Sequence, residues 1–129
     1  MAGNEGEAAL EVLRRRGASD QLVAKAVAAG LPPPTLLRAI EAAGWICRLR
    51  RWLRPSAPLS SEEQRRLANI AELAEAVAEL EPDAAGVERF WRTPMPWLGG
   101  RSPVDTLASR DGPAVVADLV NRLRYGIYS

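Results

Sequence analysis

Apolar residues recur every three or four positions through most of the chain, the spacing of one face of an α-helix. The clearest case follows two overlapping capping boxes, in which Ser60 pairs with Glu63 and Ser61 with Gln64. The apolar series there is Leu67, Ile70, Leu73, Ala74, Val77 and Leu80. It predicts a helix of about twenty residues that ends before Pro82. No stretch alternates with period two for long enough to predict a strand, so we expect an all-α fold.

Shorter helices are predicted before this long one. They run from Glu7 to Arg16, from Ser19 or Asp20 to Gly30, through TLLRAIEAAG (35–44) after three prolines, and through WICRLRRWL (45–53) up to Pro55. Glycines at 17 and 30 are suited to the helix ends, because glycine readily adopts a left-handed conformation. The segment PSAPL (55–59) is the expected linker, which divides the chain into residues 1–55 and 56–129.

The segment after residue 90 reads FWRTPMPWLGGRSPVDTL. Its X-Pro pairs favour extended backbone and Gly100 permits a positive φ, while Trp91, Trp97 and Leu98 can anchor the loop by burial. Ser102 is the expected N-cap of a short helix with Pro103 in its first position. A last helix should start near 111–113 and end at Gly126. Its expected inward residues are Val115, Val116, Leu119, Val120 and Leu123.

The chain has 129 residues and a formal net charge of +1, which suits one domain or two very small ones sharing a core. The charge is unevenly distributed: residues 1–55 carry nine basic and five acidic side chains, and residues 56–129 carry eight and eleven. Each half therefore has the potential for its own partner. Cys47 is the single cysteine, and neither a signal peptide nor a run of about 18 apolar residues is apparent. We expect a cytoplasmic protein that does not enter membranes.

Residues that could carry chemistry are scarce. The chain has no histidine, which excludes His-based dyads, triads and zinc sites. Cys47 in a basic amphipathic segment is better explained as a buried thiol, and Glu72, Glu75 and Glu79 as a solvated helix face. Gly99 and Gly100 lack the lysine of a phosphate-binding loop. We therefore expect no enzymatic activity, no metal and no cofactor.

The order W-x-T-P-x-x-x-L-x-G-x-S-P-x-D-x-L, followed by a glycine-started helix and a closing arginine-aromatic-glycine, resembles the C-terminal toxin-binding domain of the MbcA/ParS/Xre antitoxins. The matching positions are Thr93, Pro94, Leu98, Gly100, Ser102, Pro103, Asp105, Leu107, Gly112, Leu119, Arg124 and Gly126. The resemblance extends over residues 60–129, because LSSEEQRRLANIAELAEAV is similar to the long helix that precedes this motif in the family. The chain departs from the pattern at Met95, where the family usually has Asn, and at Phe90-Trp91, where it usually has Trp-Leu.

This resemblance implies an antitoxin of a type II toxin–antitoxin pair. The usual partner is a RES-domain toxin that consumes NAD, and the antitoxin covers the entrance to its active site, often with its C-terminal end. The residues that we expect at this interface are Trp91, Trp97, Leu98, Arg101, Arg124, Tyr125, Tyr128 and Ser129. Trp91 and Leu98 are equally suited to the core, and the last residues to a frayed tail.

The family also implies an N-terminal helix-turn-helix, here in a degenerate form that packs on the toxin-binding domain. With Gly30 at the turn, Ala26, Leu31, Leu36 and Ala39 occupy packing positions, whereas Lys25 falls where an apolar residue is expected. The candidate DNA-binding residues are Thr35, Arg38, Arg48, Arg50 and Arg51. Either this unit binds operator DNA and represses its own operon, or it serves packing and homodimer formation.

A different class of function stays open on the sequence alone: a stand-alone helix-turn-helix DNA-binding transcriptional regulator without a toxin. A tandem gene for a RES-domain protein would favour the antitoxin, and a tight operator site without such a gene would favour the regulator. A toxin of another fold is a third alternative.

Overall fold

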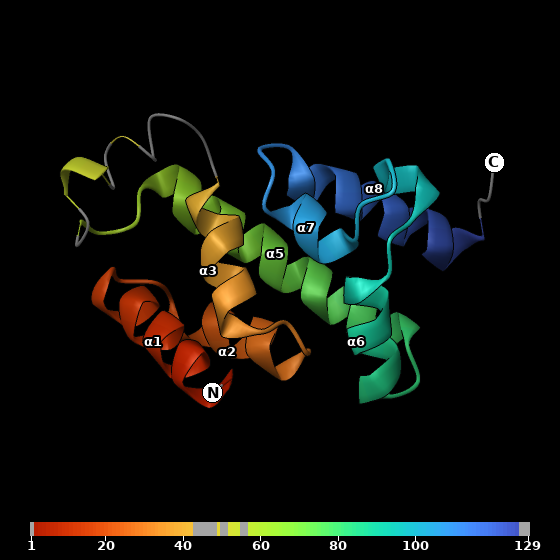
Figure 1. Cartoon of the computed structure of the whole chain (residues 1–129), viewed down its shortest axis with the longest axis horizontal. Coiled ribbons are helices and arrows are strands. Elements are labelled where there is room, and N and C mark those ends of the chain that lie inside the picture. Colours follow the sequence, from red (N-terminus) through yellow and green to blue (C-terminus); the bar gives the residue numbers. More distant parts are fainter. Residues whose placement is uncertain (1, 43–48, 50–51, 55–56, 127–129) are drawn as a thin grey trace.

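The computed structural model describes residues 2–42, 49, 52–54 and 57–126 (Figure 1). The described helices are α1 (Ala2–Arg15), α2 (Asp20–Ala28), α3 (Pro33–Glu41), α5 (Ser61–Leu80), α6 (Ala84–Arg92), the 3-10 turn η1 (Pro96–Leu98), α7 (Pro103–Leu107) and α8 (Gly112–Tyr125). Within these residues the only extended pairing is an isolated antiparallel bridge between Met95 and Arg101. The predicted all-α class is confirmed.

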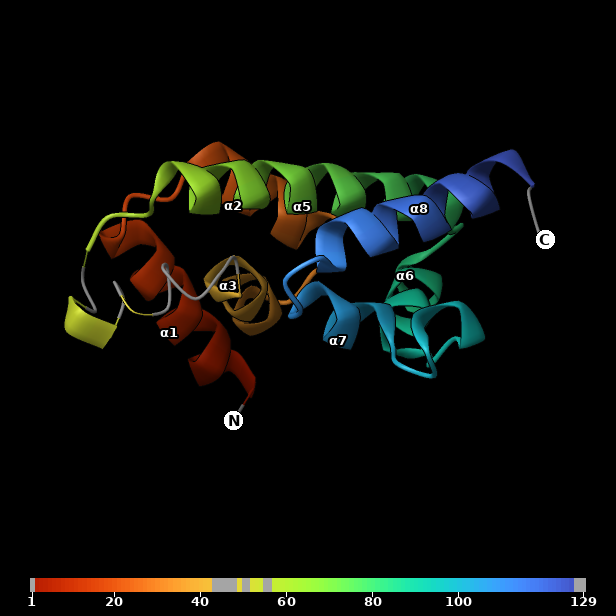
Figure 2. The ribbon, with the colours of Figure 1, turned by 90° about the horizontal axis from the view of Figure 1, so that it is seen from above.

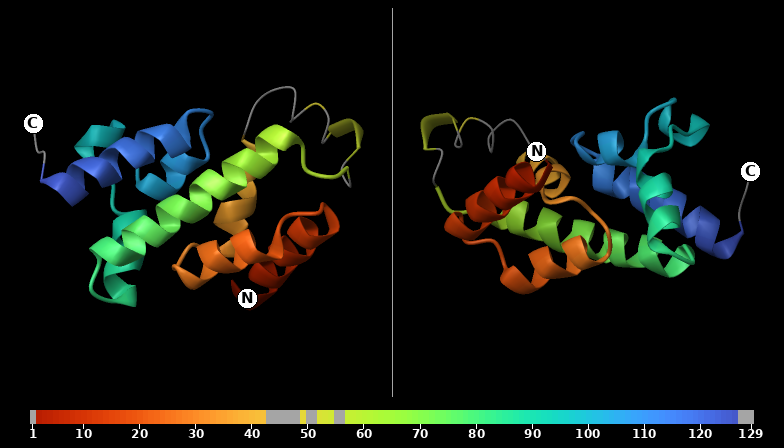
Figure 3. Two further views of the ribbon diagram at one scale, coloured as in Figure 1. Left: turned by 180° about the vertical axis from the view of Figure 1, so that it is seen from behind. Right: turned by 60° about the horizontal axis from the view of Figure 1, so that its bottom comes forward.

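Helix α5 is the spine of the molecule. It contacts α2, α3, α6 and α8, while α1 packs on α3, and α7 packs on α6 and α8. Seen from above, α5 runs along one side, with α1, α3 and α7 on the opposite side (Figure 2). From behind, α8 lies beside one end of α5, and α1 and α2 lie at the other end (Figure 3). The long helix therefore joins the two halves of the chain.

The buried apolar side chains form one cluster that draws on both halves. The largest of its fully buried apolar side chains are Leu13, Leu31, Leu36, Ile40, Leu67, Ile70, Val77, Trp91, Leu107, Val116 and Val120. The predicted series on α5 is buried except for Leu80, which is half-buried. Helix α5 supplies core residues toward both halves of the chain. The domain boundary that the sequence suggests at residue 55 therefore stays a prediction.

Local signals at helix ends are largely confirmed. Ser19 caps α2 by accepting from the amide of Leu22, and Ser60 forms its capping box with Glu63. Ser102 accepts from the amide of Asp105 at 3.2 Å and caps α7, and Gly126 ends α8 with φ +69°. Each of these caps depends on residues three or four apart, which is why the sequence alone predicts them.

Other boundaries were predicted wrongly. Helix α1 begins at Ala2 instead of Glu7, and α3 begins at Pro33, because the first turn of a helix tolerates proline. The second capping box does not form: Ser61 is the first residue of α5, and the side-chain amide of Gln64 donates to the carbonyl of Gly17 at 3.1 Å. This contact links α5 to the turn after α1.

The inward face of α8 was also predicted too broadly. Val116, Leu119 and Val120 are buried, but Val115 and Leu123 are 39% and 38% exposed. Helix α8 packs mainly on α5 and α7, so only part of its circumference is covered. The apolar residues beyond that part face solvent.

Two arginines are buried between elements. Arg16 at the end of α1 donates to the carbonyl of Ala57 at 3.0 Å and pairs with the buried carboxylate of Glu63 at 3.3 Å. Arg66 of α5 donates to the carbonyl of Ala39 in α3. It also reaches the α7–α8 connection, where it donates to the carbonyls of Leu107 (2.8 Å), Arg110 (2.7 Å) and Ser109. Arg66 thereby joins the N-terminal helices to the C-terminal ones.

Burial lowers the pKa of the Arg66 guanidinium by removing water, and the nearby carboxylates of Glu62 and Asp111 oppose that effect. Its four carbonyl acceptors favour the charged form.

None of the described helices is both long and apolar enough to cross a membrane.

Candidate protein-binding site

The loop between α6 and α7 is a tight, closed turn. The amide of Met95 donates to the carbonyl of Arg101 at 3.1 Å, and the amide of Gly100 donates back to the carbonyl of Met95 at 3.0 Å. Gly99 and Gly100 have φ values of +67° and +83°, in the left-handed region that favours glycine. The positive φ predicted for Gly100 is confirmed. These bonds fix the direction of the side chains on η1.

The two anchors expected on η1 behave differently. Leu98 is buried, whereas Trp97 is 51% exposed and does not anchor the loop by burial, so that part of the prediction was wrong. The Trp97 ring is instead covered by the guanidinium of Arg122, whose Cζ lies 4.6 Å from the ring centroid. Arg122 is in turn held by Asp118 one helical turn earlier, with Nε 3.0 Å from Oδ2. The loop and α8 thus share one preformed surface.

Trp91 lies in the last turn of α6, just before this loop. It is 1% exposed and packs edge-on against Phe90, with ring centroids 5.4 Å apart. The sequence allowed either the core or the interface for Trp91 and Leu98. Both residues lie in the core. They support the loop from within instead of presenting their side chains at the surface.

The remaining predicted interface residues lie in the α6–α7 loop and in the last turn of α8. Arg101 is exposed and donates to the carbonyl of Asp105 at 3.0 Å. Arg124 pairs with Glu79 of α5 at 3.1 Å. Tyr125 is 70% exposed. Tyr128 and Ser129 lie outside the described residues. We call the set Trp97, Arg101, Arg122 and Tyr125 the Trp97 surface. Arg122 was not predicted, although its spacing of three from Tyr125 places both on one face of α8.

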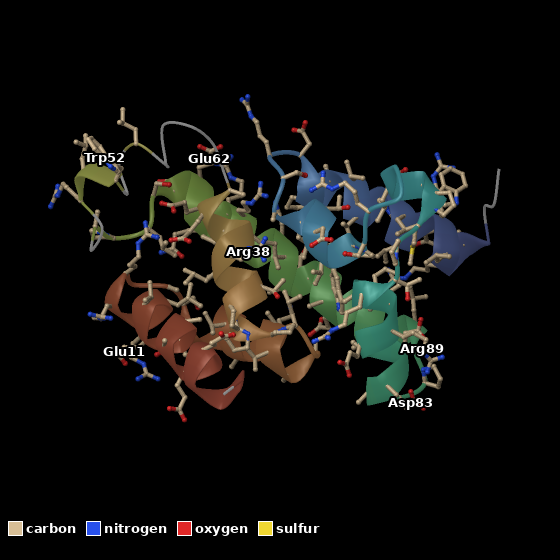
Figure 4. The ribbon with its side chains drawn as sticks, viewed as in Figure 1. Glu11, Arg38, Trp52, Glu62, Asp83 and Arg89 are labelled. Atoms are coloured by element: carbon tan, nitrogen blue, oxygen red, sulfur yellow. The ribbon has the colours of Figure 1, made fainter. Side chains whose placement is uncertain are left out.

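The N-terminal candidates fall in two groups. Thr35 is half-buried in the first turn of α3, and Arg38 is exposed on the same helix (Figure 4). Arg48, Arg50 and Arg51 lie outside the described residues. The proposed packing positions Ala26, Leu31, Leu36 and Ala39 are all buried. Lys25, the exception, is half-buried and pairs with Glu75 of α5 at 3.5 Å, so its ammonium remains near solvent.

Residues 73–126 match the model of the antitoxin Xre/MbcA/ParS C-terminal toxin-binding domain. The resemblance of this part of the chain to the Xre/MbcA/ParS antitoxins, expected from the sequence, is confirmed. The match begins within α5 and ends at the cap of α8, a narrower span than the expected 60–129. It contains the whole Trp97 surface.

Two curated relatives agree with this assignment. A protein named "Antitoxin Xre" from Yersinia enterocolitica is 35% identical over 69 residues, 53% of this chain and 47% of that protein. A protein named "Prs ADP-ribosylating antitoxin" from a Sphingobium strain is 28% identical over 81 residues, 56% of this chain and 51% of that protein. The chain thus spans about half the length of the curated relatives it matches. No solved structure gives a significant match.

Proposed function

We propose that the chain is an antitoxin that binds a RES-type, NAD-consuming toxin and covers the entrance to its active site. The observation that carries this proposal is that the matched family domain, residues 73–126, coincides with the elements that build the Trp97 surface. In this proposal the chain acts by binding and needs neither a metal nor a cofactor of its own.

The Trp97 surface has the properties of a binding hot spot. Tryptophan, tyrosine and arginine contribute most often to binding energy, and Trp97 and Tyr125 are large aromatic side chains with half or more of their surface exposed. Stacking against Arg122 orders Trp97 before a partner arrives, which lowers the entropy lost on binding. Beyond Gly126 the chain continues with Ile127, Tyr128 and Ser129, and we propose that these residues enter the toxin's active-site entrance.

The test is co-expression with the product of the adjacent gene and purification through a tag on this chain. The proposal requires the two proteins to co-purify at a fixed ratio through size-exclusion chromatography. A partner that separates from this chain would contradict it. A chain shortened to end at Gly126 then tests the tail: it should still co-purify through the Trp97 surface but lose inhibition.

A second role, in DNA binding and dimer formation, is supported by separate observations. Arg38 is exposed on α3, where the base-contacting helix of a helix-turn-helix would lie, and the four packing positions behind it are buried. Leu49, Trp52 and Leu53 are exposed apolar residues, and we propose that they contribute to a homodimer. Trp52 lies at the end of the molecule remote from α8 (Figure 4). The proposed setting is the cytoplasm.

The DNA role is tested by titrating labelled DNA from upstream of the gene with the intact chain and with Arg38→Ala. The substitution should weaken binding by about tenfold if Arg38 contacts a base. Binding that is equally weak for the upstream DNA and for random DNA would instead support a helix-turn-helix retained for packing. Dimer formation is measured independently by sedimentation of the intact chain and of Trp52→Ser.

A further inference from the structure

A charged cavity of about 300 Å³ lies between the start of α5 and the connection from α7 to α8. Three arginines line it, Arg65 and Arg66 of α5 and Arg110 of the connection. Two carboxylates, those of Glu62 and Asp111, line it as well, so the positive charges exceed the negative ones by one. The cavity is large enough for a phosphate group. We call it the Arg65–Arg110 cavity.

The three arginines of this cavity differ in what holds them. Arg66 is buried, and its hydrogen bonds all go to carbonyl groups, which are neutral and leave its positive charge in place. Arg65 and Arg110 are exposed, and neither side chain has an ion-pair or hydrogen-bond partner among the described residues. Two guanidinium groups are therefore free to bind an anion beside a third that is fixed.

The first turn of α8 adds a backbone donor. Asp111 makes no side-chain cap there, and the amide of Gly112 donates to the carbonyl of Ser109. Pro113 has no N–H, so the amide of Ala114 is the one left without an intrahelical acceptor. Ala114 also lines the cavity. Amides in this position favour phosphate groups, so this donor supplements the arginines.

The cavity adjoins α3, the helix that we propose to contact DNA bases. Arg66 donates to the carbonyl of Ala39 in α3, and α3 packs on α5. Arg38, the neighbour of Ala39, is exposed and has no ion-pair or hydrogen-bond partner among the described residues. Proteins that place a helix in the major groove bind the flanking phosphates with arginines of neighbouring elements. The cavity lies on such a neighbouring element.

We infer that the Arg65–Arg110 cavity binds a phosphate group of the DNA backbone, with Arg65 and Arg110 as its ligands. The inference rests on the DNA role proposed for α3 and extends that role into residues 56–129. A phosphate contact carries no sequence information, so it strengthens binding to any DNA by the same factor. The carboxylate of Asp111 opposes the contact, because it lines the same cavity without capping α8.

The direct test measures how binding of the intact chain to labelled upstream DNA depends on salt. The double substitution Arg65→Gln and Arg110→Gln should weaken binding by about tenfold and lower the slope of log affinity against log salt by about one, because one phosphate contact is lost. The loss should be equal for upstream and random DNA, unlike that of Arg38→Ala. The control Arg89→Gln changes an exposed arginine of α6, far from Glu62 of the cavity, and should leave the slope unchanged (Figure 4).

The outcomes separate this inference from the role of α3. An unchanged slope in the double variant would overturn the inference while the specific binding that depends on Arg38 stands. An equal loss in Arg89→Gln would indicate general charge attraction and would also overturn it. If the intact chain binds no DNA, both proposals fall.

A gain of affinity provides a second test. Asp111→Asn removes the opposing carboxylate and should strengthen binding to either DNA by about threefold. The fold should be unaffected, because Asp111 is exposed and its side chain makes no cap hydrogen bond. The matched control is Glu88→Gln, which removes an exposed carboxylate of α6 that does not line the cavity, and it should bind within about 1.5-fold of the unmodified chain. Binding that is unchanged or weaker in Asp111→Asn would contradict the inference.

Discussion

The guanidinium of Arg122 in α8 covers the ring of Trp97 in the α6–α7 loop, with Cζ 4.6 Å from the ring centroid. Residues 25 positions apart in the sequence thus form one exposed unit, and Asp118 holds the arginine in place. Such a pair orders a tryptophan that is half-exposed and would otherwise sample several rotamers. This unit is the centre of the proposed partner interface.

Trp97→Ala should reduce affinity for the co-purifying partner by about 2 kcal/mol, roughly thirtyfold, while changing the free energy of unfolding by less than about 1 kcal/mol. The control is Arg65→Ala, because Arg65 is also exposed but lies near the start of α5, outside the Trp97 surface. Isothermal titration calorimetry measures both variants. Equal affinity of the Trp97 variant and the unmodified chain would exclude this surface.

Arg66→Ala should destabilise the fold by about 3 kcal/mol or more, because four carbonyl groups lose a charged donor. The substitution also removes the side chain that links α3 to the α7–α8 connection. Urea unfolding followed by circular dichroism measures the change. The neighbouring exposed residue gives the control, since Arg65→Ala should change stability by less than about 0.5 kcal/mol. A loss below 1 kcal/mol for Arg66→Ala would show that water replaces the guanidinium.

Two glycines in helices should respond in opposite directions to alanine. At Gly112 an added Cβ would lie 2.8 Å from Cα of Leu107 and would overlap the carbonyl oxygen of Thr106, so the α7–α8 contact must open. We expect Gly112→Ala to cost about 2 kcal/mol or more. At Gly6 in α1 the nearest atom is 4.0 Å away, so Gly6→Ala should stabilise by about 0.5–1 kcal/mol. Thermal unfolding of both variants measures this difference, and a similar Tm for the two would contradict it.

Gly99 has a left-handed backbone conformation, so substitutions there should differ in their effect on partner binding through backbone preference alone. Its φ and ψ of +67° and +29° suit asparagine but not a β-branched residue, and an added Cβ meets nothing within 4 Å. Gly99→Asn should therefore retain partner binding within about threefold, whereas Gly99→Val should weaken it by about tenfold through distortion of η1. Binding that is equal in the two variants would show that the loop geometry is not needed.

The parts of the fold that the sequence predicts are those set by neighbouring residues. The capping box of Ser60, the cap at Ser102 and the left-handed Gly126 each follow from a pattern within one helical turn. Burial depends on which elements pack together, so Val115 and Leu123 were wrongly predicted to face inward. Such exposure cannot be read from periodicity once a helix is apolar over more than one face.

The candidate site shows the same limit. Trp97 and Tyr125 were predicted because exposed aromatic residues and arginines favour interfaces, but the stacking of Arg122 on Trp97 joins two distant segments and has no local signal. Arg66 is a similar case, because nothing in RRLAN distinguishes it from the exposed Arg65. Only the three-dimensional packing shows which of the two meets the ends of α3 and α7.

The most direct measurement is the rate of NAD loss catalysed by the product of the adjacent gene, alone and with increasing amounts of this chain. The account predicts that NAD loss falls to background at the stoichiometry of the purified complex, and that a chain ending at Gly126 binds without full inhibition. NAD loss that continues unchanged in a saturated complex would contradict inhibition by occlusion.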